Sequence, residues 1–183
     1  LEANSTGNIK YRISVKNIIN EISKENNYKD IYMEVLDARQ KILILANAPH
    51  PDLGAMKSLI TTNKNYEVDI KYPEGNNYNI NDYNVVVLHN LPSRKNKIVA
   101  DLEVIKRKNI SILHIFGSQT DANAFNRIQN VIKLEGNSNS LENIQAEVDQ
   151  NFSLFTTSDD IKRKLGQFPP LIAPFGKYLT GAT

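Results

Sequence analysis

The sequence predicts an α/β protein in which a short parallel β-sheet is flanked by helices. Two kinds of segment alternate along most of the chain. Residues 42–45 and 85–88 are continuous apolar runs, as expected for strands buried on both faces. Segments with apolar residues at helical spacing lie between such runs, joined by short loops. Strands that alternate with helices in this way form right-handed crossovers and a parallel sheet.

The first 37 residues have a different pattern and predict a pair of β-strands. Apolar residues recur at every second position, at Ile9, Tyr11, Ile13 and Val15 and again at Ile31, Met33 and Val35. The two strands could form a hairpin across the polar stretch 20–29, or could be the last strands of a sandwich. Because a lone hairpin is only marginally stable, we interpret residues 1–37 as the tail of an upstream β-sandwich domain. Residues 37–40 then form a linker.

Residues 41–183 predict the α/β domain itself. Strands are expected at 42–45, 66–72, 85–88 and 110–116, and helices at 52–60, 98–108 and 122–128. We expect Asp52 to cap the first helix, and Thr120 or Asp121 to cap the third. Right-handed crossovers favour the strand order 2-1-3-4, which is the flavodoxin-like arrangement.

The pattern is weaker after Asn130. Residues 131–134 suggest another strand, and Leu141, Ile144 and Val148 suggest a helix. A further helix is expected to begin after Ser158 and to end at Gly166. The proline-containing stretches within 168–176 look like turns in an extended connection. These segments do not complete a core, so we expect the domain to be truncated at its C-terminus.

Composition excludes several classes of protein. With 40% hydrophobic and 23% charged residues, the chain fits a globular protein. The net charge of +2 predicts no general attraction to nucleic acid or to acidic membranes. The chain has no cysteine, which excludes disulfides, thiolate metal sites and a cysteine nucleophile. No apolar run reaches the roughly 20 residues that a membrane helix needs.

Polar residues follow three of the predicted strands, where a parallel sheet binds ligands. We expect six of them to converge on the carboxyl edge: Asn47, His50, His89, Asn90, Ser118 and Gln119. They are ligand-binding candidates, and the alternative is that they are ordinary loop residues that make caps and turns.

The sequence gives only weak support for metal binding and for serine catalysis. His50 and His89 are expected to approach each other, but no Asp or Glu is obviously placed as a third ligand, so we predict no metal site and no cofactor. His114 is expected to be a buried, hydrogen-bonded core residue. Ser118 lies at a strand-to-helix turn without the second glycine of G-x-S-x-G, and no histidine follows it. Ser118 is therefore only a weak nucleophile candidate, with His50 or His89 as its base.

Several stretches together resemble a bacterial protein family. They are residues 41–52 (KILILANAPHPD), 86–93 (VVLHNLPS), 115–120 (IFGSQT), 151–155 (NFSLF), 168–171 (FPPL) and 174–178 (PFGKY). The chain is similar, over about residues 10–180, to the C-terminal class I glutamine amidotransferase-like region of large membrane-anchored proteins associated with von Willebrand factor A-type domains. The resemblance implies an amidotransferase-like fold, a β-sandwich upstream and more sheet and helix downstream. Amidotransferases of this class use a cysteine where this chain has Ser118, so thiolate attack on glutamine is impossible here.

Together these observations favour a non-catalytic cell-envelope module with a binding or assembly role over an enzyme. The alternatives left open are a divergent serine hydrolase that uses Ser118 and a small-ligand sensor at the strand-end pocket. The resemblance implies the extracytoplasmic, periplasmic part of an inner-membrane protein, with a cytoplasmic location as the alternative. Expected partners are another protein or other domains of the same chain, with no nucleic acid and with membrane contact only through segments outside this sequence.

Overall fold

A computed structural model describes residues 6–16, 19, 27–35, 39–75, 77–136, 140–149, 156 and 158–180. The chain divides into two compact units, Leu1–Arg39 and Gln40–Thr183. Within the described ranges, no helix is both long enough and apolar enough to span a membrane.

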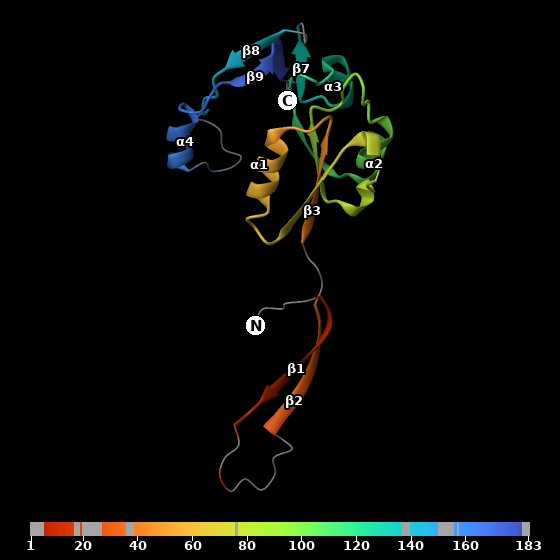
Figure 1. Ribbon diagram of the computed structural model, residues 1–183, viewed down its shortest axis with the longest axis vertical. Helices are drawn as coiled ribbons and strands as arrows, with labels where there is room; N and C mark the ends of the chain where they lie inside the picture. Colours follow the sequence, from red (N-terminus) through yellow and green to blue (C-terminus); the bar gives the residue numbers. More distant parts are fainter. Residues whose placement is uncertain are drawn as a thin grey trace. The chain divides into compact units, whose positions relative to one another are not determined.

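The first unit contains a two-stranded antiparallel ribbon, drawn in red and orange in Figure 1. Strand β1 (Gly7–Ser14) pairs with β2 (Tyr28–Val35), from Gly7 opposite Val35 to Ser14 opposite Tyr28. Asp30 accepts two hydrogen bonds from Arg12, at 2.7 and 2.9 Å, and forms an ion pair with Lys10 at 2.7 Å. These cations hold the pKa of Asp30 well below its usual range. The upstream sandwich stays a prediction. Most of the polar stretch 20–29 and half of the predicted linker 37–40 lie outside the described residues.

The second unit is built on a four-stranded parallel sheet. Its strands are β3 (Gln40–Ala46), β4 (Tyr66–Lys71), β5 (Val85–His89) and β6 (Ser111–Ile115). Their order across the sheet is β4-β3-β5-β6, and each neighbouring pair is parallel. Counted from β3, this is the order second, first, third, fourth. The prediction of an α/β unit with a parallel sheet flanked by helices is confirmed.

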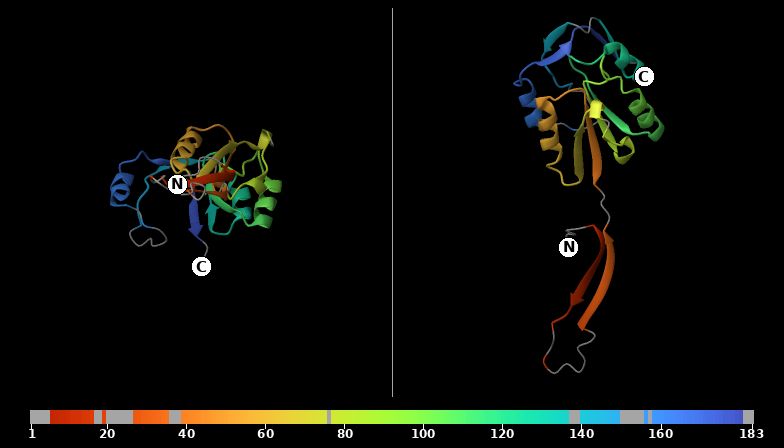
Figure 2. Two further views of the ribbon diagram at one scale, coloured as in Figure 1. Left: turned by 90° about the horizontal axis from the view of Figure 1, so that it is seen from below. Right: turned by 45° about the vertical axis from the view of Figure 1, so that its right-hand side comes forward.

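Helices cover both faces of this sheet. Helix α1 (Pro51–Ile60) lies on one side of β3, and α2 (Val99–Lys108) lies on the other (Figures 1 and 2). The alternation of side chains along β3 explains how one strand serves both layers. Ile42 and Ile44 pack in a cluster with Leu53 of α1, whereas Leu43 and Leu45 pack in a second cluster with residues of α2. Helix α3 (Ala122–Ile128) follows β6, and short 3₁₀ turns, η2 (Pro73–Gly75) and η3 (Ile80–Asp82), precede β5.

The segment after α3 forms two further strand pairs (Figure 1). Strand β7 (Ile132–Glu135) pairs antiparallel with β10 (Lys177–Thr180), and β8 (Leu141–Ile144) pairs antiparallel with β9 (Leu171–Pro174). Helix α4 (Asp159–Leu165) lies between β8 and β9 in the sequence. Ser158 is its N-cap and Gly166 is its C-cap, as predicted.

Two expectations for this segment are wrong. The helix expected from Leu141, Ile144 and Val148 is a strand over Leu141–Ile144, and the predicted turns of 168–176 include strand β9. The physical reason is a pairing between distant segments, in which Ile144 lies opposite Leu171. A spacing of three and four residues fits a helix locally, but cross-strand pairing outweighs that weak local preference. Residues 151–155, part of the family resemblance, lie outside the described residues.

Candidate functional site

The carboxyl ends of β3, β5 and β6 lie side by side, and their loops form the candidate site. The Asn47 amide donates to the His89 carbonyl at 3.0 Å, and the Asn90 amide donates to the Ile115 carbonyl at 2.9 Å. These two backbone hydrogen bonds connect the ends of the three strands, directly after the last paired residues of the parallel sheet. We call this region the strand-end site. All six residues predicted to converge are at this edge, in two neighbouring groups.

The first group is a hydrogen-bonded network centred on the Asn47 side chain. Asn47 Oδ1 accepts from Ser93 Oγ at 2.7 Å and from Asn96 Nδ2 at 3.0 Å. Asn47 Nδ2 donates to Gln119 Oε1 at 2.6 Å. Ser93 in turn accepts from the Asn96 backbone amide at 2.9 Å. One amide thus ties together the loops that follow β3, β5 and β6.

A shallow pocket of about 250 Å³ opens beside this network. The residues that line it are all polar or charged, and they are Asn47, Ser93, Arg94, Lys95, Ser118, Gln119 and Thr120. Lys95 forms an ion pair with Glu74. The Ser118 hydroxyl and the Gln119 Nε2 group make no hydrogen bond within the described parts of the chain. Both groups are therefore available to a ligand.

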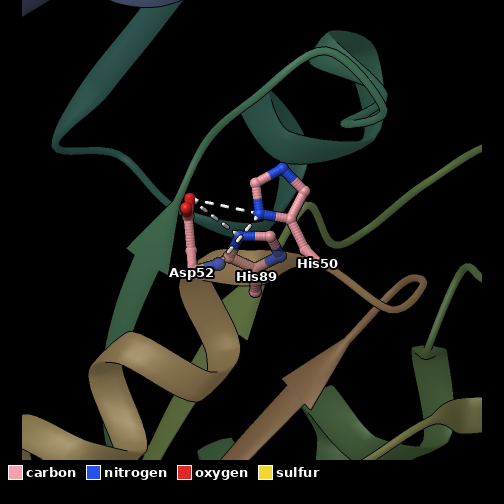
Figure 3. Close-up of side chains that lie close together, drawn as sticks. All are labelled: His50, Asp52 and His89. Atoms are coloured by element: carbon pink, nitrogen blue, oxygen red, sulfur yellow. Dashed lines mark hydrogen bonds and ion pairs between the residues drawn. The ribbon is translucent and has the colours of Figure 1, made fainter. Parts of the chain in front are cut away.

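The second group consists of two imidazoles and a carboxylate (Figure 3). The rings of His50 and His89 lie 5.0 Å apart between centroids. Asp52 Oδ2 lies 3.3 Å from His50 Nδ1 and 3.7 Å from His89 Nε2. The expectation that no carboxylate joins the two histidines is therefore wrong.

The start of helix α1 explains how Asp52 reaches the histidines. The helix begins at Pro51, and His50 rather than Asp52 is its N-cap, with the His50 ring accepting from the Asp52 backbone amide at 3.3 Å. Proline suits the first helical position because its fixed backbone angle matches the helix and it has no N–H to satisfy. Asp52 is thereby moved into the first turn, and its carboxylate lies beside both rings instead of capping the helix.

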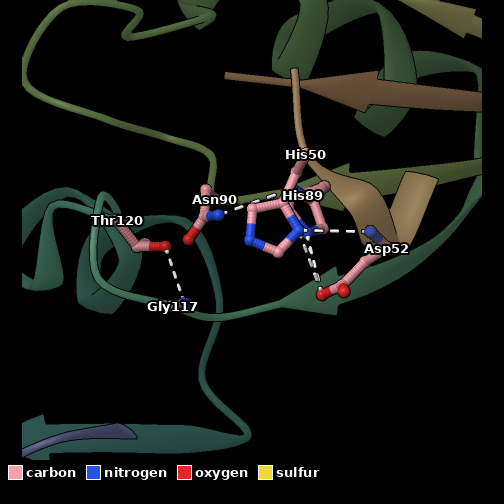
Figure 4. Close-up of polar contacts among 6 residues, drawn as sticks. All are labelled: His50, Asp52, His89, Asn90, Gly117 and Thr120. Carbon is pink, nitrogen blue, oxygen red and sulfur yellow. Dashed lines mark hydrogen bonds and ion pairs between the residues drawn. The ribbon is translucent and has the colours of Figure 1, made fainter. Parts of the chain in front are cut away.

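His89 is the buried member of this group, with 2% of its side chain exposed. Burial, followed by repulsion from His50, lowers the pKa of His89 below the usual histidine value, and Asp52 opposes this shift. His89 Nδ1 lies 3.4 Å from Asn90 Nδ2, as Figure 4 shows. The neutral ring can accept that amide proton.

Asn90 and Gly117 are in close contact behind the histidines (Figure 4). Asn90 has a φ of 56°, which asparagine adopts more readily than most residues. A Cβ atom at Gly117 would lie only 2.3 Å from Asn90 Oδ1, so glycine leaves the space that Asn90 occupies. Asn90 Oδ1 is buried and has no hydrogen-bond partner among the described residues.

Ser118 lines the pocket but is not coupled to a base. No hydrogen bond joins its hydroxyl to His50 or His89 in the part of the chain that the structure describes. His89 contacts Asp52 through one ring nitrogen and Asn90 through the other. A nucleophilic serine needs a base within hydrogen-bonding reach, and this arrangement does not supply one.

His114 differs in part from its predicted role. It packs edge-on against Phe125 of α3, with ring centroids 5.3 Å apart, so it does point into a helix–sheet layer. The expected hydrogen bond is not formed at Nδ1, which is buried without a partner among the described residues. Burial lowers the pKa of His114.

Sequence reasoning missed four members of the site: Asp52, Ser93, Asn96 and Thr120. Thr120 caps the turn after β6, where its hydroxyl accepts from the Gly117 amide at 3.2 Å. Ser93 and Asn96 share a loop with the predicted Asn90, and Asp52 follows the predicted His50 by two positions. The sequence therefore indicates that the strand ends form the site, but it does not tell which side chains of each loop point into the site.

Comparisons with models of known protein families, with curated proteins and with solved structures find no match. The fold and the strand-end site are the basis for the proposals that follow.

Proposed function

We propose that the α/β unit is a non-catalytic binding module whose ligand is a small polar molecule held at the strand-end site. The single observation that carries the proposal is the Asn47 network, which fixes the floor of a polar pocket before any ligand arrives. Binding sites are generally formed in advance and offer a few well-placed polar groups. A fixed floor also lowers the entropy lost on binding.

The pocket favours a ligand with hydroxyl, amide or carboxylate groups. Gln119 Nε2 and the hydroxyl of Ser118 can donate to such groups, and the ammonium of Lys95, which is paired with Glu74, also lines the pocket. The volume of about 250 Å³ suits a molecule of amino-acid or monosaccharide size. A role as a ligand sensor is a special case of this proposal.

The test is a thermal-shift screen of polar metabolites, followed by calorimetry on any that stabilise the chain. We expect at least one class of small polar compound to bind saturably. Gln119→Ala should weaken that binding, while Gln167→Ala, an exposed glutamine outside the site, should leave it unchanged. Absence of binding across such a library would argue against the proposal.

Assays of turnover separate this function from hydrolysis. We expect no steady-state cleavage of amide or ester substrates by the wild-type chain. If cleavage were found and Ser118→Ala abolished it, the hydrolase alternative would replace the binding proposal.

An assembly role is supported by a separate observation on the β8–β9 pair. Ile144 and Leu171 face each other across the two strands and are 39% and 57% exposed. Contiguous exposed apolar patches, rather than single residues, mark surfaces that contact another protein or domain, and we propose that this pair belongs to such a patch. Sedimentation of the chain over a range of concentrations would test this role as self-association, and Ile144→Ser should weaken any association seen.

The amidotransferase-like fold and the cell-envelope location are proposed on the sequence resemblance alone. On this proposal the natural protein is anchored in the inner membrane with this unit in the periplasm. Cell fractionation of the natural polypeptide, with and without protease treatment of spheroplasts, tests the location. Protection from protease in intact spheroplasts would favour the cytoplasmic alternative.

A further inference from the structure

The three side chains of the histidine group present their donor atoms to one point. His50 Nδ1, Asp52 Oδ2 and His89 Nε2 come from the β3–α1 connection, the first turn of α1 and the end of β5. One ligand atom from each lies within 4.8 Å of the other two. Figure 3 shows the carboxylate beside both rings.

The distances from Asp52 Oδ2 to the two ring nitrogens match those between two ligands of one metal ion better than those between the donor and acceptor of a hydrogen bond. Protein N–H···O hydrogen bonds measure about 2.7–3.2 Å between heavy atoms. The separations here are 3.3 Å for His50 and 3.7 Å for His89. A tetrahedral zinc ion with bonds of about 2.0–2.1 Å separates its ligand atoms by roughly 3.3–3.4 Å. Placing all three atoms around one ion requires side-chain rotations, in which His50 Nδ1 exchanges the hydrogen bond from the Asp52 backbone amide at 3.3 Å for the ion.

Asn90 supplies an independent observation. A metal-bound histidine almost always donates its second ring N–H to an oxygen. His89 Nδ1 lies 3.4 Å from the Asn90 amide, and the oxygen of that same amide is buried without a partner. Because Asn90 is 8% exposed, water does not readily satisfy this oxygen. Turning the amide about its last bond would bring Oδ1 to His89 Nδ1–H and leave Nε2 free to bind metal. The amide nitrogen would then take the buried position beside Gly117 that Oδ1 leaves.

The surroundings set the kind of ion. Imidazole with carboxylate suits zinc and similar divalent transition ions, whereas calcium and magnesium prefer oxygen alone. The N-terminus of α1 repels a cation, and the Asp52 carboxylate offsets that repulsion. An anion is less well suited, because Asp52 lies against both rings.

We propose that His50, Asp52 and His89 bind one divalent transition-metal ion of the zinc class, with Asn90 orienting His89. Since His50 and Asp52 are 44% and 60% exposed, the fourth coordination position opens to solvent. Three protein ligands with one open position are the arrangement of zinc sites that bind a further ligand. The proposal does not depend on the pocket ligand, because none of these three ligands lines that pocket.

The direct test is zinc binding to the untagged chain, followed by nitrogen NMR of the imidazoles. The chain has only three histidines, so each ring can be assigned and His114 is an internal control. We expect one zinc ion per chain, with large shifts at a ring nitrogen of His50 and of His89 and none at His114. If excess zinc leaves His50 and His89 unchanged, or shifts all three rings alike, the proposal is overturned.

Substitutions test the ligand set with cobalt(II) as a visible probe. Asp52→Asn keeps the shape of the side chain, and both Asp52 and His50 are exposed, so Asp52→Asn and His50→Ala should still fold. We expect each to weaken metal binding by about tenfold or more, and His114→Gln to change it less than about twofold. Equal weakening by His114→Gln, or none by the other two in folded protein, contradicts the proposal.

Asn90→Gly tests the positioning role, because glycine accepts the positive φ while removing the amide. We expect about tenfold weaker binding and a changed protonation pattern of the His89 ring nitrogens in the metal-bound protein. Unchanged affinity and an unchanged His89 nitrogen spectrum would remove Asn90 from the proposal.

Discussion

Asn47 shows how much of the strand-end site depends on one side chain. Its amide accepts two hydrogen bonds and donates a third, to partners from two other loops. A shorter side chain could not reach them, and a carboxylate could not donate to Gln119. The choice of asparagine at this position thus follows from the need for both a donor and an acceptor on one planar group.

Asn47→Ala should lower the free energy of unfolding by about 1–3 kcal/mol, because it leaves the buried Ser93 hydroxyl and the half-buried Asn96 amide without their acceptor. The measurement is urea unfolding of the whole chain followed by the helical circular dichroism signal. The control is Asn81→Ala, since Asn81 is exposed and, among the described residues, its side chain bonds to nearby Asn79. A loss for Asn47→Ala no greater than for Asn81→Ala would show that the network contributes little.

At the scale of the secondary-structure elements, Tyr83 links the segment before β5 to strand β4. Its hydroxyl donates to Asp69 Oδ2 at 2.9 Å. Burial, with the Asp69 hydrogen bond second, raises the pKa of Tyr83 from 10.0 to about 12. A raised folded-state pKa means that the neutral form is favoured by folding. The stabilisation is therefore complete below pH 10 and is lost as the pH rises toward about 12.

Tyr83→Phe should therefore cost about 1 kcal/mol at neutral pH, and this difference from wild type should shrink as the pH rises above 10. Urea unfolding of both chains over this range measures it. Tyr66→Phe is the matched control, because the Tyr66 hydroxyl makes no hydrogen bond among the described residues. A Tyr83→Phe difference that stays constant across the alkaline range would contradict the assigned cause.

The elements also show where prediction from sequence succeeds. Strands β3 and β5 are apolar on both faces and bounded by loop residues, so their burial and parallel pairing follow from the residues alone. Strands β8 and β9 are four residues each, and their partners are distant in sequence. No local pattern separates such a strand from one turn of helix.

Prediction of the candidate site from sequence also succeeds for some residues and fails for others. Topology alone brings together the loops that follow β3, β5 and β6, so the proximity of His50 and His89 was predictable. The position of Asp52 was not, because it depends on whether the helix begins at Pro51, with His50 as N-cap, or two positions later, with Asp52 as N-cap. Likewise, the role of Ser93 depends on the course of an irregular loop.

At the scale of the whole molecule, the chain consists of two units with separate internal support. The buried residues of the two apolar clusters described above lie within residues 42–105 of the second unit, and the partly buried residues packed against them extend to Ile128. The first unit has a two-stranded ribbon with an exposed ion-pair group, and a single hairpin is at best marginally stable in water. We therefore expect the second unit to fold on its own and the first unit not to.

Deleting residues 1–39 should leave the unfolding free energy of the second unit within about 0.5 kcal/mol of its value in the whole chain, because a unit with its own core folds alone. The isolated 1–39 peptide should show rapid amide exchange throughout. Hydrogen exchange on both pieces and on the whole chain measures this. Failure of residues 40–183 to fold, or strong protection in the isolated peptide, would show that the units depend on each other.

The close contact between Gly117 and Asn90 has an evolutionary consequence. A side chain at position 117 would require the space of the Asn90 amide, and Asn90 itself holds a backbone angle that few residues tolerate. The two positions should therefore be inherited as a pair. Any descendant that replaces Gly117 with alanine should already carry glycine at position 90, because the reverse order passes through a clashing intermediate. The pair thus gives a sparse signature for finding distant relatives whose remaining sequence has diverged.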